Sequence, residues 1–126
     1  MRTDDQLTLE IIAAARTVHK ELGPGFVEPI YNKALGLELK VRDLAVEREK
    51  LVRIFYGGCL VGRHYLDLVV DGRVILELKA TRAIIPVFEA QMHSYLTASD
   101  YGLGLIVNFG SAELEWSRSQ KVPAQP

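Results

Sequence analysis

Cysteine, long apolar stretches and a strong net charge are all scarce in this chain. The single cysteine, Cys59, excludes an intrachain disulfide and a zinc site built from several cysteines. No apolar run approaches the roughly 20 residues of a membrane-spanning helix. The N-terminal residues, which include Asp4 and Asp5, lack the basic start and apolar stretch of a secretory signal. We therefore expect a cytoplasmic protein with no membrane partner.

The near balance of charge limits the function classes further. The chain has 15 Lys and Arg residues and 16 Asp and Glu residues, which give a formal net charge of −1. A protein that coats nucleic acid usually carries a basic excess. If this chain acts on nucleic acid, it needs a local basic patch, a partner, or metal ions to offset phosphate repulsion.

The spacing of apolar residues predicts both helices and strands along the chain. Helices are expected over residues 4–22, 28–43 and 86–98. Strands are expected over residues 46–56, 60–70, 73–80, 101–109 and 112–116. Gly57-Gly58 and Asp71-Gly72 are hairpin turn signals. We assign residues 1–116 to a single domain and residues 117–126 to a flexible C-terminal tail.

The order of these elements predicts an α/β fold. Two helices, three strands, one helix and two strands suit a mixed central β-sheet flanked by α-helices. The strand at 101–109 follows a helical crossover, so we expect it to pair in parallel with an earlier strand.

Two carboxylates and a lysine lie on neighbouring expected strands. Glu77 and Lys79 are two residues apart, so they project to the same face of their strand. The position of Asp67 depends on the turn at Asp71-Gly72. A two-residue loop sets Asp67 opposite Leu76, whereas a three-residue loop or a bulge sets it across from Glu77. The sequence permits both registers.

These charges have a structural explanation and a functional one. Asp67 stands among aliphatic residues, so pairing with Lys79 across the strands would offset the expense of burying it. Glu77 and Lys79 suit the exposed face of a half-buried strand. In the functional alternative, Asp67 and Glu77 supply the oxygen ligands that Mg2+ (or Mn2+) prefers, and Lys79 orients the attacking water or stabilises developing charge. The combination favours metal-dependent hydrolysis of a phosphodiester.

A metal site of this kind has a consequence for pH dependence. Carboxylates must be ionised to hold the metal ion, so activity is expected to fall at low pH. A flat pH–rate profile through the acid range would contradict metal binding by these residues.

Further candidates lie outside the strands. Gln91 and Tyr95 are four residues apart on one face of the expected third helix, where both can bind phosphate. Tyr95 is equally explained as a core aromatic. Glu28, at the start of the second helix, either reaches the metal as a third acidic residue or interacts with the helix N-terminus. Strand alternation turns His64 away from Asp67, so we expect no catalytic role for His64.

Taken in order, these residues resemble a known family. Asp67 followed by Glu77-x-Lys79 is similar to the D…(D/E)xK signature of the PD-(D/E)xK nuclease superfamily. Gln91-x-x-x-Tyr95 resembles the QxxxY motif of its RecB-type exonuclease branch. Gly25-x-x-Glu28-x-x-Tyr31 resembles the pattern that names the GxxExxY proteins, which are small and mostly bacterial. One departure is Leu66, which stands where the superfamily name has a proline.

The resemblance implies a restriction-endonuclease-like core and a defined site. The catalytic candidates are Glu28, Asp67, Glu77, Lys79 and Gln91, the metal ligands are Asp67, Glu77 and Glu28, and the substrate contacts are Tyr31 and Tyr95. The implied activity is that of a Mg2+- or Mn2+-dependent nuclease, for which we expect a DNA substrate. The alternatives are a nucleic-acid- or protein-binding module that retains the fold without turnover, and a structural partner subunit or homo-oligomer.

Overall fold

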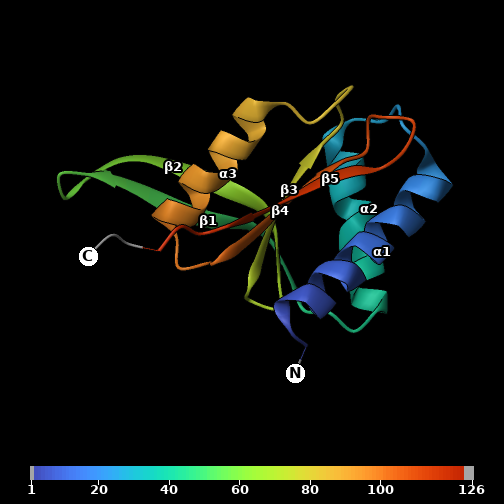
Figure 1. Ribbon diagram of the computed structural model, residues 1–126, viewed down its shortest axis with the longest axis horizontal. Coiled ribbons are helices and arrows are strands. Elements are labelled where there is room, and N and C mark those ends of the chain that lie inside the picture. The colour runs from blue at the N-terminus through green and yellow to red at the C-terminus, as the bar shows by residue number, and fades with distance from the viewer. Residues whose placement is uncertain (1, 124–126) are drawn as a thin grey trace.

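The computed structural model describes residues 2–123, which form three helices and a five-stranded sheet (Figure 1). The helices are α1 (Asp4–Leu22), α2 (Glu28–Val41) and α3 (Pro86–Ala98). The strands are β1 (Val46–Tyr56), β2 (Cys59–Val70), β3 (Val74–Lys79), β4 (Leu103–Asn108) and β5 (Glu115–Gln120). The α/β fold expected from the order of elements is confirmed.

The sheet is mixed, and its strands lie in their sequence order. β3 and β4 are parallel, whereas the other neighbouring pairs are antiparallel. α3 connects the two parallel strands, so the expectation for the strand after the helical crossover is also confirmed. The carboxyl ends of β3 and β4 meet at one edge of the sheet, where Lys79 pairs with Asn108.

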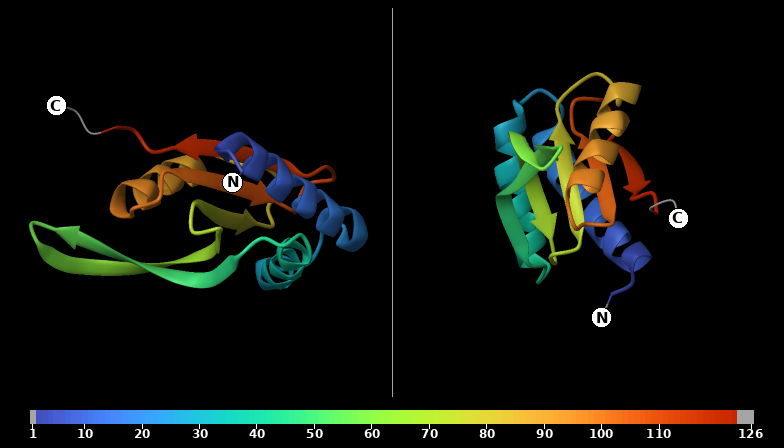
Figure 2. Two further views of the ribbon diagram at one scale, coloured as in Figure 1. Left: turned by 90° about the horizontal axis from the view of Figure 1, so that it is seen from below. Right: turned by 90° about the vertical axis from the view of Figure 1, so that its left-hand side faces the viewer.

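The helices cover opposite faces of this sheet (Figure 2). On one face, α1 and α2 bury residues such as Leu7 and Leu35 against Leu76. On the other face, α3 buries Met92 against Ile75. Both helix layers are therefore held by removal of apolar side chains from water. None of the helices in residues 2–123 combines the length and the apolar character needed to cross a membrane.

The ends of α1 and α2 follow from local chemistry. α1 begins with a capping box, in which the side chains of Thr3 and Gln6 each accept a hydrogen bond from the other residue's backbone N–H. α2 ends at Val41, two residues before the expected 43, because Asp43 takes a φ of 61° that a right-handed helix does not allow.

The turn between β2 and β3 decides the register of the candidate site. Val70 pairs with Val74, which leaves three residues in the loop. Continuing this antiparallel register sets Asp67 across from Glu77. The three-residue alternative is therefore the one that the chain adopts, and the two carboxylates meet.

The β1–β2 hairpin turns at Gly57-Gly58, as expected, and twists sharply in its middle. Glu49 has a φ of 53°, and strand pairing is interrupted where Glu49 faces Asp67. Leu68 belongs to the core under α1 and α2, but Leu66, only two residues away, belongs to the core under α3. The twist therefore exchanges the two faces of the hairpin at Asp67.

The last strand lies later in the sequence than expected. β5 covers Glu115–Gln120 rather than residues 112–116, so the predicted boundary between domain and tail after Trp116 is wrong. Its residues are mostly polar, which hides the strand from a search for apolar runs. The backbone of this edge strand pairs with the apolar β4, and that pairing defines it. Residues 124–126 of the expected tail lie outside the described part of the chain.

Candidate functional site

Asp67 lies where β2 and β3 separate. Backbone pairing of these strands stops at Leu68 and Leu76. Beyond this pair, Asp67 Oδ2 accepts a hydrogen bond of 2.7 Å from the backbone N–H of Leu78. This bond holds the Asp67 carboxylate beside Glu77, in the space that opens between the two strands.

Glu77 is a buried carboxyl with only 8% of its surface exposed. Burial raises the pKa of Glu77 to about 9, and the charge of Asp67 and a hydrogen bond with Asp67 act in the same direction. Lys79 lowers the Glu77 pKa, and the charge of Glu28 raises it slightly. Glu77 therefore holds a proton at neutral pH unless a cation takes its place.

His64 belongs to the site, although strand alternation predicted the opposite. Its Nε2 lies 2.9 Å from Glu77 Oε1, and its ring stacks on Tyr95 with centroids 3.9 Å apart. Burial lowers the pKa of His64, and although the charge of Asp67 opposes the shift, the ring is neutral at pH 7. The contact with Glu77 is therefore a hydrogen bond rather than a charged pair.

The wrong expectation for His64 has a specific cause. Alternation assumes a regular strand between His64 and Asp67, but the hairpin exchanges its faces beside Glu49. Glutamate seldom adopts a positive φ, so nothing in the sequence marks this twist.

Lys79 is oriented by an aromatic ring rather than by a carboxylate. Its Nζ lies 4.3 Å from the centroid of the Phe88 ring, on the first turn of α3. Within residues 2–123, Lys79 forms no salt bridge with Asp67 or Glu77. The structural alternative of a direct Asp67–Lys79 ion pair is therefore not what the chain adopts.

α3 presents the two polar candidates at the same edge of the site. Tyr95 stacks on His64, and Phe88 contacts Lys79 two turns earlier. Gln91 is exposed on the turn between them. Burial, followed by the charges of Glu77 and Asp67, raises the pKa of Tyr95, so its hydroxyl remains a hydrogen-bond donor at neutral pH.

Glu28 lies next to Asp67, and both residues line one small pocket. The pocket has a volume of about 150 Å³ and is lined by Glu28, Pro29, Asn32, Arg48, Glu49 and Asp67. Asn32 lies one helical turn after Glu28, donates to the Asp67 backbone oxygen at 3.5 Å and accepts from Arg48 Nε at 3.0 Å. The sequence analysis did not single out Asn32. The one sequence signal that could have located it is its spacing of four residues from Glu28, which puts both side chains on the same face of α2.

Tyr31 has a structural role, which corrects the expectation that it contacts substrate. Its side chain is fully buried and stacks on Phe109 with centroids 4.6 Å apart. Its hydroxyl accepts hydrogen bonds from the backbone N–H groups of Gly25 and Phe26 and donates to the Gly23 oxygen. Tyr31 thus fastens the loop that leads into Glu28, which explains the Gly-x-x-Glu-x-x-Tyr spacing.

Removal of the Tyr31 hydroxyl tests this role. The Tyr31→Phe variant leaves three loop backbone groups without their partner, so we expect the free energy of unfolding to fall by about 1–3 kcal/mol in urea denaturation. Tyr65→Phe, at an exposed tyrosine, is the matched control and should change it by less than about 0.5 kcal/mol. Unchanged stability of Tyr31→Phe together with weaker substrate binding would restore the original expectation.

The donor set suits a hard divalent cation. No group of three or more His, Cys, Asp or Glu side chains in residues 2–123 has the arrangement of a metal site. At the point where β2 and β3 separate, which we call the fork, Asp67 and Glu77 nevertheless offer adjacent oxygen ligands. A cation there would offset the burial and the repulsion by Asp67 that raise the Glu77 pKa. The residues present therefore fit Mg2+ or Mn2+ held by these two carboxylates.

One comparison with known proteins gives a match. The family described as the PD-(D/E)XK nuclease superfamily matches residues 5–119. Neither the curated proteins nor the solved structures include a significant match. The matched range contains the whole candidate site and extends into β5.

Proposed function

Because this chain belongs to the PD-(D/E)XK nuclease superfamily, we propose that it is a divalent-metal-dependent nuclease that hydrolyses phosphodiester bonds in DNA. The observation that carries the proposal is the meeting of Asp67, Glu77 and Lys79 where β2 and β3 separate. Lys79 forms no salt bridge with either carboxylate. The three residues at the fork therefore suit phosphoryl chemistry better than a structural ion pair.

The two carboxylates are the proposed ligands of Mg2+ or Mn2+. Asp67 is preorganised by the Leu78 N–H, and Glu77 is oriented by His64. Glu28 is the proposed third acidic residue at the rim. When bound, the ion supplies charge for the phosphoryl oxygen and lowers the pKa of a water molecule.

The remaining side chains bind and orient the substrate. Lys79, resting on Phe88, offers its ammonium group to the negative charge that develops on the phosphate. Gln91 can donate to a phosphate oxygen or to the attacking water, and protonated Tyr95 can donate to phosphate. His64 acts through Glu77 and is a positioning residue.

Within the superfamily, we propose that the chain groups with the GxxExxY proteins. The support is the Gly25-x-x-Glu28-x-x-Tyr31 loop, in which Tyr31 holds the backbone of Gly25 and Glu28 begins α2. In this arrangement the motif delivers one carboxylate to the edge of the site.

A cleavage assay tests the proposal. Purified wild type is incubated with single- and double-stranded DNA and RNA and with Mg2+ or Mn2+, beside Asp67→Asn and the exposed control Asp100→Asn. We expect DNA cleavage by wild type and by Asp100→Asn, and a rate about 1000-fold lower for Asp67→Asn, since the charge that holds the metal is lost. The same background with wild type and Asp67→Asn would exclude catalysis at this site.

The raised pKa of Glu77 favours a second function, which is binding without turnover. A protonated Glu77 is a poor metal ligand, so the site would then be a relict of a nuclease within a binding module. Isothermal titration calorimetry separates the two functions. Mg2+ should bind wild type more tightly than Glu77→Ala if the site is catalytic, and equally weakly if it is a relict.

A further inference from the structure

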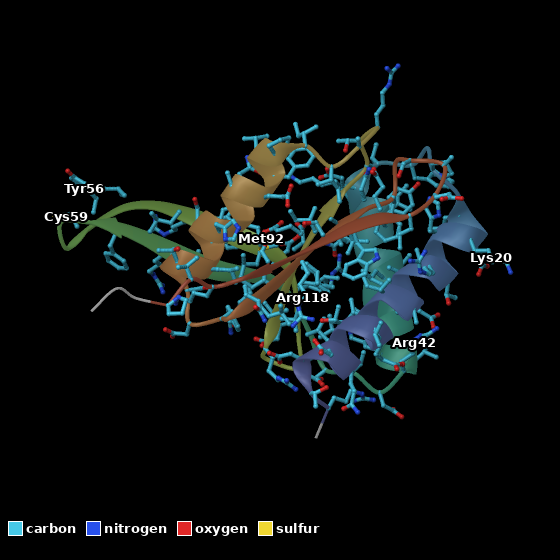
Figure 3. The ribbon with its side chains drawn as sticks, viewed as in Figure 1. Lys20, Arg42, Tyr56, Cys59, Met92 and Arg118 are labelled. Carbon is cyan, nitrogen blue, oxygen red and sulfur yellow. The ribbon has the colours of Figure 1, made fainter. Side chains whose placement is uncertain are left out.

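The β1–β2 hairpin carries a projecting arm, which we define as residues 50–65. β2 pairs with β3 only from Leu68 onward, so residues 59–65 extend past the fork with β1 as their one partner strand in the described sheet. The arm reaches beyond α3 on the side away from α1 and α2 (Figures 1 and 2). Tyr56 and Cys59 lie at its tip (Figure 3).

The arm has a charge opposite to that of the rest of the chain. Residues 50–65 contain Lys50, Arg53 and Arg63 and no Asp or Glu, so their formal charge is +3. The remaining residues have 12 Lys and Arg against 16 Asp and Glu, so their charge is −4, and the sum is the −1 of the whole chain. Lys50 is paired with Glu47, just outside the arm, so Arg53 and Arg63 form the local basic patch that a nearly neutral protein needs to approach a polyanion.

Two arginines of the arm face each other. Arg53 pairs directly with Arg63 across the two strands, so both side chains project from the same face. Like charges in this position repel, and neither arginine forms a salt bridge within residues 2–123. A bound anion such as a phosphate would offset this repulsion, and each of the two guanidinium groups can donate charge-assisted hydrogen bonds to a phosphate.

Exposed aromatic rings flank the arginine pair. Tyr65 lies two residues after Arg63 on β2, so it shares the face of that arginine. Phe55 lies two residues after Arg53 on β1, beyond a register shift between Ile54 and Phe55, and lines the same groove as Arg53. Tyr65 is 57% exposed and Phe55 is 60% exposed. Beside them, a groove of about 590 Å³ lies between the arm and α3 and is lined partly by Arg53, Phe55 and His93.

We propose that the arm binds single-stranded nucleic acid, with Arg53 and Arg63 on phosphates and Tyr65 and Phe55 stacked on bases. Bases are available for stacking on protein rings only when they are unpaired, which selects a single strand over a duplex. The inference rests on the proposed function in one respect, namely that the bound strand leads to the site. Arg63 lies about 13 Å from Asp67 along β2. Arg63 and Tyr65 project from the face opposite His64, so the bound strand follows the twist of the hairpin beside Glu49 to reach Asp67.

A binding assay in EDTA separates this surface from catalysis. Fluorescence anisotropy with a labelled 20-nucleotide oligo(dT), at low salt, is measured for wild type, Arg53→Ala/Arg63→Ala and Tyr65→Ala. We expect the double variant to lose affinity about 10-fold or more, and Tyr65→Ala about 5- to 100-fold. Arg16→Ala/Lys20→Ala, which removes two exposed charges from α1, is the matched control and should stay within about 3-fold.

Three results would overturn the proposal. One is a double variant that binds the oligonucleotide as wild type does, and another is equal binding of duplex that does not depend on Tyr65. The third is binding to phosphatidylserine vesicles that the arm variants lose while they keep oligonucleotide affinity, which would assign the arm to a membrane surface. Unchanged circular dichroism of each variant shows that the exposed substitutions leave the fold intact.

The arm and the proposed nuclease activity fail in different ways. If the arm variants lose affinity but wild type cleaves nothing in Mg2+ or Mn2+, the proposal for the arm is supported and the proposed nuclease activity is wrong. If wild type cleaves DNA and the arm variants retain both affinity and rate, the nuclease assignment stands and the arm proposal falls.

Discussion

Lys79→Met is expected to lower the kcat of DNA cleavage by about 100- to 1000-fold. Methionine retains the apolar stem that rests on Phe88, so packing changes little, but the positive charge is lost. Removing one preorganised donor to the developing charge of a transition state typically has an effect of this size. Single-turnover cleavage at saturating substrate measures the loss, and it should appear in kcat more than in KM.

Two further variants make the Lys79 prediction specific. Lys33→Met, at an exposed lysine of α2, should cleave at the wild-type rate. Lys79→Arg should restore part of the lost activity because it returns the charge without the same geometry. If Lys79→Met keeps more than a third of the wild-type rate, the lysine has no part in the chemistry.

Metal-free protein is expected to become less stable as the pH rises, and Glu77 is the cause. The folded-state pKa of Glu77 is about 9 against an ordinary value of 4.5, so the folded chain holds a proton that the unfolded chain releases. The free energy of unfolding therefore falls between these two pH values, by at most about 1.4 kcal/mol per pH unit. Below 4.5 the contribution is fully present, and above about 9 the decline ends.

Glu77→Gln isolates this contribution. Glutamine has no titrating group, so urea denaturation in EDTA at pH 6 and pH 8.5 should show a smaller decline than in wild type. Glu113→Gln, an exposed glutamate, is the matched control and should follow wild type. Adding Mg2+ should raise the melting temperature of wild type at pH 8.5 and not that of Glu77→Gln. Equal pH slopes for wild type and Glu77→Gln would show that Glu77 titrates normally.

Much of the fold was predictable because the local signals agree with the packing. Helical spacing gave α1 and α3 with their observed bounds, and the Gly57-Gly58 signal gave the first hairpin. The meeting of Asp67 with Glu77 was predictable only as one of two registers. Loop length decided between them, and a sequence containing Asp71-Gly72 suits both lengths.

The errors trace to backbone features that side-chain identity does not encode. The positive φ of Glu49 twists the hairpin and carries His64 into the site, against strand alternation. β5 is defined by backbone pairing with β4, so its polar residues gave no apolar signal. The motif predicted a substrate contact for Tyr31. Only the three hydrogen bonds between its hydroxyl and the loop backbone distinguish a structural tyrosine from a substrate-binding one.

A metal ion held between Asp67 and Glu77 is the central proposal, and a crystal structure of the protein with Mn2+ at pH 8 tests it most directly. An anomalous difference peak within about 2.0–2.3 Å of a carboxylate oxygen from each residue is the predicted result. The peak should be absent from crystals of Asp67→Asn grown in the same solution. A wild-type map with no peak at the fork, and with Lys79 turned onto Asp67 as an ion pair, would contradict the account.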